Sequence, residues 1–301
     1  MATKPSTIQQ QILDFYKAPG SMTSAGKYVA ALEKLPSDPA ALVAVVQGLT
    51  VHEYAAPDFY GFSIPEKRKD ESHIRSAEKM LDRVFALDRR PLVVPREVPD
   101  RLVGVCHHFV VLLTAMLRAR SVPARARYGF GAYFNPGVFE DHSICEYWNA
   151  TESRWVLVDP QFDEIWRQRL KINHDVLDVP RDRYLVGADA WAKCRGGEAD
   201  ASQFGIFRGG LRGMWFVAGV LIRDLAALNK MEMLQWDTWG AVPRRDDSIS
   251  DEQLAFFDRI AALTRDPDAS FGELRSLYDT NDGVRVPPVA FNAVLNRPEP
   301  I

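Results

Sequence analysis

The sequence predicts an α+β protein in which a helix that begins at a cysteine precedes an antiparallel pair of strands. Apolar residues recur at helical spacing after Cys106, from Phe109 to Leu117, and this period is typical of a helix that faces a core. Two strand-like runs, 141–148 and 154–160, are separated by a polar stretch of hairpin-loop length. Further helical patterns flank this region, so we expect a helix packed on an antiparallel sheet, with helical additions at both ends.

The N-terminal segment is expected to be helical. Ser6 or Thr7 can cap a first helix, which should end before a proline-glycine pair. A second helix should begin where Asp38 precedes Pro39, because an acidic N-cap followed by proline favours a helix start. A charged helix with one apolar face follows, and an extended, proline-punctuated stretch, 91–99, leads to the cysteine.

Cys106 would lie in the first turn of its helix. Unpaired backbone N–H groups and the helix macrodipole stabilise negative charge there, which favours the thiolate form of a cysteine. The same N–H groups can receive the oxyanion of a tetrahedral intermediate. Cys106 is therefore a candidate nucleophile.

His142 and Asp159 supply the other groups that an activated thiol needs. They lie at the outer ends of the predicted hairpin, so their side chains can meet across the two strands. An imidazole can take the proton of a thiol, and a carboxylate can fix the tautomer of the imidazole. Cys106, His142 and Asp159 are the candidate catalytic residues.

These residues resemble the transglutaminase-like domain over roughly residues 100–165. The family pattern is a Gly-x-Cys at a helix start, a Leu-Arg-Ala turn that ends in Pro-Ala-Arg, a His-x-x-x-Glu strand and a Trp-x-x-x-Asp-Pro strand. In this sequence the four parts are residues 104–106, 117–125, 142–146 and 155–160. One departure is Ile144, which stands where a Trp is common beside the histidine.

The resemblance implies a papain-like α+β fold with Cys106 as nucleophile, His142 as base and Asp159 as the residue that orients the base. It implies a single-domain member of the bacterial type, because nothing here resembles the β-sandwich domains of the large, calcium-activated animal enzymes. It does not imply one substrate, since the family includes acyl transferases, amidases, peptidases and inactive domains.

Other interpretations of these residues also exist. A cysteine before an apolar helix is commonly a small buried hydrophobic residue. A catalytic role for Cys106 is favoured because His142 and Asp159 follow it at the spacing that such a site needs. His107 and His108 do not share the helical face of Cys106, so we interpret them as surface or packing residues. We interpret Glu146 as a partner for a basic residue or a backbone amide.

A metal site is the main rival use of the same side chains. The zinc-competent residues are Cys106, His142, Cys145 and His174. Residues three apart on a strand, such as His142 and Cys145, point to opposite faces, and no Cys-x-x-Cys pair occurs. The sequence also lacks a calcium-binding loop pattern. We therefore expect no metal and no other cofactor.

Composition limits the expected partners and location. The 301 residues carry a formal net charge of −3, which gives no basic field for nucleic acid. The most apolar run, 214–222, is too short to span a bilayer, and residues 1–5 lack the apolar stretch of a signal peptide. Three cysteines without paired spacing suit a reducing compartment. We expect a cytoplasmic protein with no membrane partner.

The C-terminal part is expected to be mainly helical. A long amphipathic helix is predicted over 215–236, and Ser250 is predicted to cap a later helix. Trp236 and Trp239 are either core residues or the wall of a ligand pocket, and in the second case they would bind substrate. We expect one catalytic domain, 1–301, with a core at about 60–165, a helical N-terminal segment 1–60 and an extension 165–301.

The predicted function is cysteine-dependent acyl transfer. Cys106 would attack an amide or thioester, an acyl-enzyme would form, and water or an amine would take the acyl group. The acyl substrate could be a small molecule, a peptide or a carrier-bound group. Two alternatives remain open, a cysteine peptidase or amidase that hydrolyses a small peptide-like amide, and a non-catalytic scaffold or binding module of the same fold.

Overall fold

The computed structural model describes residues 7–301, so the predicted cap Ser6 and residues 1–5 lie outside the described residues. The chain divides into two compact units. The N-terminal unit comprises the described residues up to Ala126 together with Ile144–Val179, and the C-terminal unit comprises Arg127–Ser143 and Pro180–Ile301. Two continuous strands pass through this division, so each unit contains part of both.

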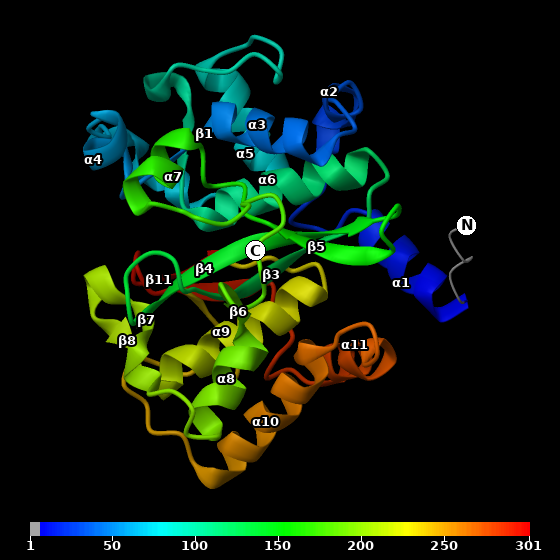
Figure 1. The fold of residues 1–301 in the computed structure, drawn as a ribbon, viewed down its shortest axis with the longest axis vertical. Helices are drawn as coiled ribbons and strands as arrows, with labels where there is room; N and C mark the ends of the chain where they lie inside the picture. Colours follow the sequence, from blue (N-terminus) through cyan, green and yellow to red (C-terminus); the bar gives the residue numbers. More distant parts are fainter. Residues whose placement is uncertain (1–6) are drawn as a thin grey trace. The chain divides into compact units, whose positions relative to one another are not determined.

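The N-terminal unit is mainly helical (Figure 1). Its helices are α1 (Thr7–Lys17), α2 (Val29–Leu32), α3 (Pro39–Leu49), α4 (Ala56–Tyr60), α5 (Ala77–Leu87), α6 (Cys106–Ala119) and α7 (Glu164–Leu170), with a 3₁₀ segment η2 (Glu66–His73). Its strands are β1 (Thr50–His52), β2 (Leu102–Gly104) and β5 (Arg154–Val158), together with parts of β3 (Ala124–Gly131) and β4 (Phe139–Asn149). Strands β1 and β2 pair in parallel, with Val51 opposite Val103.

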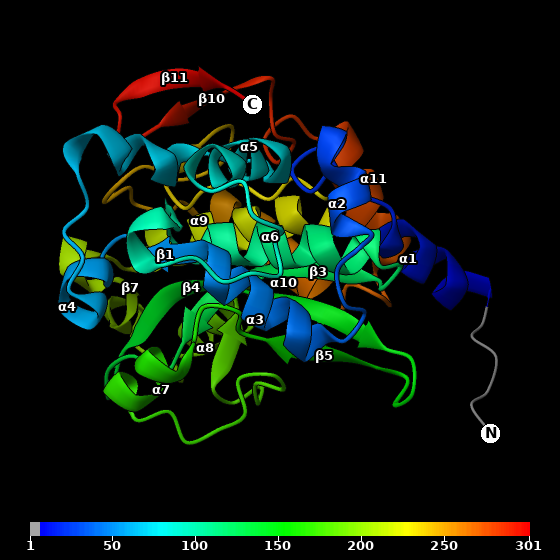
Figure 2. The same cartoon turned by 90° about the horizontal axis from the view of Figure 1, so that it is seen from above.

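Helix α6 forms the centre of the N-terminal unit. Every residue from Cys106 to Arg118 is buried, because α6 contacts α2, α3, α5 and the β1–β2 pair; Figures 1 and 2 show α3 and α5 beside it. Helix α3 begins as predicted, since Asp38 accepts a hydrogen bond from the amide of Ala41 at 2.9 Å and Pro39 occupies the first position. Packing along the whole length of α6 therefore fixes the position of the helix that begins at Cys106.

The predicted hairpin is confirmed. Strands β4 and β5 pair antiparallel, with Trp148 opposite Trp155. The Nε of Arg125 donates to Oε2 of Glu146 at 2.7 Å, and both side chains are buried. The same guanidinium lies over the ring of Trp155, 3.9 Å from its centroid. Glu146 is therefore the partner of a basic residue, as predicted.

The C-terminal unit combines a mixed sheet with a group of helices. Its helices are α8 (Gly187–Arg195), α9 (Met214–Leu228), α10 (Asp251–Arg265) and α11 (Phe271–Thr280). Its further strands are β6 (Tyr184–Val186), β7 (Phe204–Ile206), β8 (Leu211–Arg212), β9 (Asp237–Thr238), β10 (Val289–Asn292) and β11 (Arg297–Pro300). The sheet order is β6-β3-β4-β7-β8, in which β4 and β7 are parallel, and β11-β10-β9 form a separate sheet.

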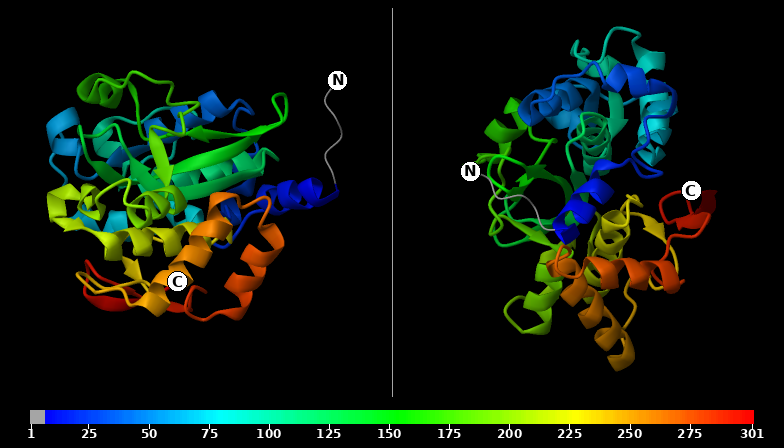
Figure 3. Two further views of the ribbon diagram at one scale, coloured as in Figure 1. Left: turned by 60° about the horizontal axis from the view of Figure 1, so that its bottom comes forward. Right: turned by 90° about the vertical axis from the view of Figure 1, so that its right-hand side faces the viewer.

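Helix α9 is the core helix of the C-terminal unit. It contacts α8, α10 and α11 (Figure 3) and is buried on all sides over most of its length, so the expected amphipathic helix is in fact a core helix. The expected extent to Trp236 was also wrong, because α9 ends at Leu228. The side-chain amide of Asn229 donates to the carbonyl of Leu225 at 2.8 Å, and Lys230 takes a left-handed backbone with φ of 63°.

Three further expectations concern a helix cap, the fold class and the domain organisation. The cap of α10 is confirmed, since the Oγ of Ser250 accepts a hydrogen bond from the amide of Gln253 at 3.3 Å. The α+β class is confirmed by helices and a mixed sheet in the same chain. The expected single catalytic domain stays a prediction, beside the finding of two compact units.

Candidate active site

Cys106 is the first residue of α6, as predicted. Val105, the N-cap, has an extended backbone with φ of −123° and ψ of −178°, so the chain changes from extended to helical at the cysteine. The Cys106 side chain is 6% exposed. Because the first-turn N–H groups of a helix have no partners within the helix, the position supplies donors close to the Sγ atom.

The side chain of His108 caps the start of α6 through a hydrogen bond that the sequence did not predict. The amide of Val105 donates to Nδ1 of His108 at 3.1 Å, and Nε2 lies 3.2 Å from the carbonyl oxygen of Glu71. These partners assign the ring proton to Nε2 and leave Nδ1 as the acceptor. Burial lowers the pKa of His108 to about 4. His108 is therefore a neutral, fully buried packing residue, so packing is confirmed as the correct one of the two interpretations, surface or packing, that the sequence allowed.

Glu71 connects η2 to the strand that leads into α6. Its carboxylate accepts bonds from Nε of Arg68 at 2.6 Å, from Nε of Arg83 at 2.8 Å and from the amide of Val103 at 2.9 Å. Burial opposes ionisation of this carboxyl, but the bonds from Arg68, Val103 and Arg83 hold its pKa below the usual value. Through its carboxylate and its carbonyl, Glu71 holds both β2 and His108.

Asp159 directly follows β5 in the same unit as Cys106. It is 0% exposed, its amide donates to the carbonyl of Val176 at 2.8 Å, and its Oδ1 accepts from the amide of Gln161 at 3.1 Å. The Oε1 of Gln161 is buried without a hydrogen-bond partner among residues 7–301. Asp159 is thus fully buried, and its amide and its side chain each form a hydrogen bond within the N-terminal unit.

His142 lies on β4, in the part of that strand that belongs to the C-terminal unit. Its side chain is 2% exposed, and its carbonyl accepts a bond from the hydroxyl of Tyr184 at 2.9 Å. Edge-on aromatic contacts surround the imidazole, with Phe134 at 5.1 Å, Tyr133 at 6.1 Å and Tyr184 at 6.4 Å between ring centroids. Aromatic rings therefore form the wall beside the histidine. The sequence did not predict this wall, because Ile144 stands where a Trp is common beside the histidine.

The three candidate residues fall on both sides of the division of the chain. Cys106 and Asp159 lie in the N-terminal unit, and His142 lies next to the point where β4 passes from one unit to the other. Their predicted meeting as a triad stays a prediction. His107 is 0% exposed with Nε2 at 3.2 Å from the carbonyl of Arg75, so it is a packing residue.

The two tryptophans suggested as substrate-binding residues lie after α9. Trp239 is 6% exposed, and its Nε1 donates to the carbonyl of Val284 at 3.1 Å. Trp236 is half-buried, and its carbonyl accepts from the amide of Ala293 at 3.0 Å. These contacts are those of a packed segment, and a role in binding substrate stays a prediction for both residues.

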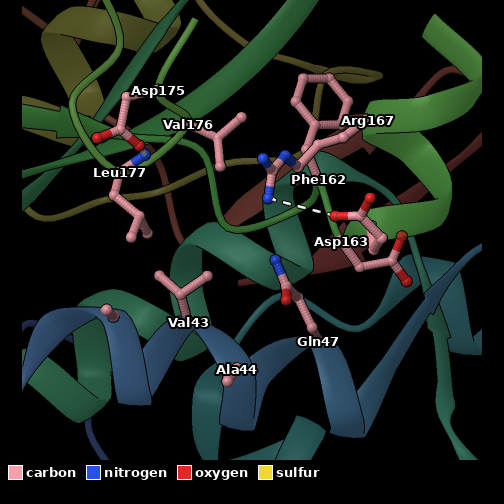
Figure 4. A pocket seen from close by; sticks show the side chains of 11 residues that line it. Val43, Ala44, Gln47, Phe162, Asp163, Arg167, Asp175, Val176 and Leu177 are labelled. Carbon is pink, nitrogen blue, oxygen red and sulfur yellow. Dashed lines mark hydrogen bonds and ion pairs between the residues drawn. The ribbon is translucent and has the colours of Figure 1, made fainter. Parts of the chain in front are cut away.

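A cavity of about 220 Å³ lies in the N-terminal unit between α3, α7 and the loop after α7. Figure 4 shows Gln47 pointing into it, beside the apolar side chains of Val43, Val176 and Leu177. Arg167 lies at its rim and is paired with Glu164 at 3.4 Å. The volume is below the about 300–1,000 Å³ that is usual for small-molecule pockets.

Within residues 7–301 no group of three or more His, Cys, Asp or Glu side chains could hold a metal ion. The same part of the chain contains no helix that is long and apolar enough to cross a membrane. Neither finding assigns a reaction or a location.

Comparison with known families identifies the segment around α6 and the hairpin. Residues 88–160 match the model of the transglutaminase-like superfamily. This segment is therefore similar to a transglutaminase-like domain. Its core contains α6 with Cys106 at the helix start, and the matched residues also include His142 and Asp159. No curated protein matches the sequence.

Two solved structures are partly similar to the chain. A candidate cysteine protease from Cytophaga hutchinsonii shares 17% identity over 58% of this chain and 45% of that chain, with a TM-score of 0.33. The periplasmic domain of TgpA from Pseudomonas aeruginosa, bound to ethylmercury, shares 18% identity over 50% of this chain and 54% of that chain, with a TM-score of 0.20. The chain thus spans about half the length of the solved chains that it matches.

Proposed function

We propose that this protein is a cysteine-dependent acyl-transfer enzyme of the transglutaminase-like type. Cys106 is the nucleophile, His142 the general base and Asp159 the residue that orients the base. The observation that carries the proposal is the position of Cys106 at the first residue of α6, inside the segment that matches the family. Histidine occurs on β4 and aspartate directly after β5, the strand that pairs with β4, which supports the other two roles.

The chemistry proceeds in two steps. The Sγ of Cys106 attacks the carbonyl carbon of an amide or thioester, and His142 takes the thiol proton and gives it to the leaving group. The first-turn N–H groups of α6 stabilise the oxyanion of the tetrahedral intermediate. The resulting thioester is then attacked by an amine or by water, which gives a transferase or a hydrolase. The acyl group belongs to a small molecule, a peptide or a carrier.

The active ester p-nitrophenyl acetate tests the first step without knowledge of the natural substrate. We expect a burst of p-nitrophenolate and an acetyl group on Cys106, located by mass spectrometry of peptides after acid quenching. Cys106→Ala should abolish both signals, and Cys194→Ala should abolish neither. A protein that shows no Cys106-dependent acetylation would instead be a binding module of the same fold.

Three substitutions assign the roles within the triad. Cys106→Ala and His142→Ala should each abolish acylation, and the double variant should be no worse, because the residues act as a unit. Asp159→Asn should retain more activity, since this carboxylate orients the base and takes no part in bond making. If His142→Ala kept most of the burst rate, another residue would be the base.

A further inference from the structure

The chain that leads into Cys106 is held at two successive residues. The carbonyl of Gly104, the last residue of β2, accepts a hydrogen bond from the amide of Glu53 at 2.7 Å. The amide of Val105 donates to Nδ1 of His108 at 3.1 Å, and the carbonyl of Val105 accepts from the amide of His108 at 2.9 Å. Two bonds between Val105 and His108 therefore enclose the cysteine, and all of these residues belong to the N-terminal unit.

The ring of His108 has a fixed orientation. Its Nε2 lies 3.2 Å from the carbonyl oxygen of Glu71, so hydrogen bonds hold the ring at both nitrogens. The ring also lies against the backbone of Gly104, where an added Cβ atom would come within 2.5 Å of Cγ and 2.7 Å of Cβ of His108. A larger residue at position 104 would therefore displace the histidine, which gives a reason for the glycine two residues before the cysteine.

A neutral acceptor at position 108 favours a thiolate at position 106. The third residue of a helix can accept a hydrogen bond from the N-cap amide, a role that Glu or Gln usually takes. A glutamate would place a negative charge in the turn of the thiolate and repel it, whereas burial keeps the imidazole of His108 neutral by lowering its pKa to about 4. The amide of Cys106 has no acceptor within its own helix, so it stays available to stabilise negative charge.

We propose that His108 is a positioning residue for the thiolate of Cys106, and that Gly104 provides the space for its ring. This inference rests on the proposed function, because it concerns the nucleophile of that reaction. By holding the N-cap amide, His108 keeps the first turn of α6 closed and the sulfur at a constant distance from the N–H groups of that turn. Loss of the acceptor leaves the amide of Val105 without a partner and lets the turn fray, which weakens the stabilisation of negative charge on the sulfur.

Alkylation by iodoacetamide tests this role without a substrate. Peptide mass spectrometry gives the rate at Cys106 between pH 5 and 10, and the alkylation midpoint is the pH of half-maximal rate. His108→Phe keeps a ring and removes the acceptor, so the midpoint should rise by about 0.5–1 pH unit, the size of a lost helix-terminus interaction. His108→Gln supplies an acceptor that can reach the N-cap amide and should keep the wild-type midpoint.

The neighbouring histidine offers a matched control. His107 is equally buried, and its Nε2 lies 3.2 Å from the carbonyl oxygen of Arg75. His107→Phe should therefore cost similar stability, measured by urea unfolding, without moving the alkylation midpoint. A purely structural role for His108 would give the two Phe variants the same midpoint.

Gly104→Ala tests the close approach of the ring independently, even if His108→Phe fails to fold. The added Cβ displaces the imidazole, so the alkylation midpoint should rise in the wild-type background. In a protein that carries His108→Ala the ring is absent, and the further change Gly104→Ala should leave the midpoint unaltered. Equal shifts in the two backgrounds would show that Gly104 does not act through His108.

The outcomes separate this inference from the proposed function. If p-nitrophenyl acetate leaves Cys106 unacylated but His108→Phe raises the alkylation midpoint, the positioning role stands and the acyl-transfer proposal falls. If His107→Phe raises the midpoint as much as His108→Phe, or if His108→Gln behaves like His108→Phe, the assignment of His108 is overturned.

Discussion

Cys106 and His142 have surroundings of opposite chemical character. Near Cys106 the backbone is fixed by directional polar contacts, since His108 holds the N-cap and Glu71 holds the preceding strand. Near His142 the side chain is enclosed by aromatic edges, and the nearest carboxyl groups on its strand, Glu140 and Asp141, have raised pKa values. A nucleophile needs a fixed position, whereas a base that passes a proton benefits from a dry, adjustable environment.

The largest expected effect on stability follows from loss of the hydrogen bonds and ion pairs of Glu71, near the start of α6. Glu71→Ala should lower the free energy of unfolding by about 3–5 kcal/mol, because it leaves the buried guanidinium of Arg68 without its carboxylate partner. Urea unfolding followed by circular dichroism measures this change. The control Glu66→Ala removes an exposed carboxylate paired with Lys69 and should alter stability by less than about 0.5 kcal/mol. Equal effects of the two substitutions would contradict a structural role for Glu71.

Protonation of His108, in the first turn of α6, should also destabilise the folded protein in acid. Its folded-state pKa of about 4 lies below the unfolded value of about 6.5, so the folded protein prefers the neutral ring. The contribution is complete above about pH 6.5 and disappears as the pH falls towards 4, with a size of about 3 kcal/mol. Urea midpoints at pH 7.5 and 4.5 measure it.

His108→Gln provides the control for that titration, because its side chain cannot gain a proton. Other groups titrate equally in both proteins, so the difference between their pH dependences isolates His108. The wild type should lose more stability than the variant on acidification. Parallel curves would show that His108 titrates alike in the folded and unfolded states.

The elements that carry the site were predictable to different degrees. The start of α6 and the β4–β5 hairpin follow from local period and loop length, and both agree with the structure. The bond between His108 and the carbonyl of Glu71 joins residues 37 positions apart, so no local pattern could indicate it. The end of α9 at Leu228 was missed because Asn229 and Lys230 are weak helix-stop signals compared with glycine or proline.

The contribution of Glu140, near His142, to stability should change with pH in the opposite direction. Burial raises the pKa of Glu140 to about 7, so its neutral form favours folding. That contribution is present below the unfolded pKa of about 4.3 and is lost as the pH rises through 7. At pH 8, Glu140→Gln should therefore be more stable than the wild type by about 1–2 kcal/mol, allowing for solvent screening of a half-buried group. At pH 5 the two proteins should unfold at similar urea concentrations, and a variant that is less stable at pH 8 would contradict the sign.

The smallest expected effect on stability concerns the aromatic wall. Phe134→Ala removes a partly exposed ring whose edge contact with His142 is worth about 0.5–1 kcal/mol. Its effect on acylation by p-nitrophenyl acetate should be distinct, because water that reaches the imidazole stabilises the imidazolium and moves the pH midpoint of the burst rate upward. The control Phe85→Ala removes a partly exposed ring that stacks on Tyr28 at 5.1 Å and should cost similar stability without moving that midpoint. If both variants leave the pH profile unchanged, the aromatic rings only pack against His142. In that case they do not exclude water from the proposed base.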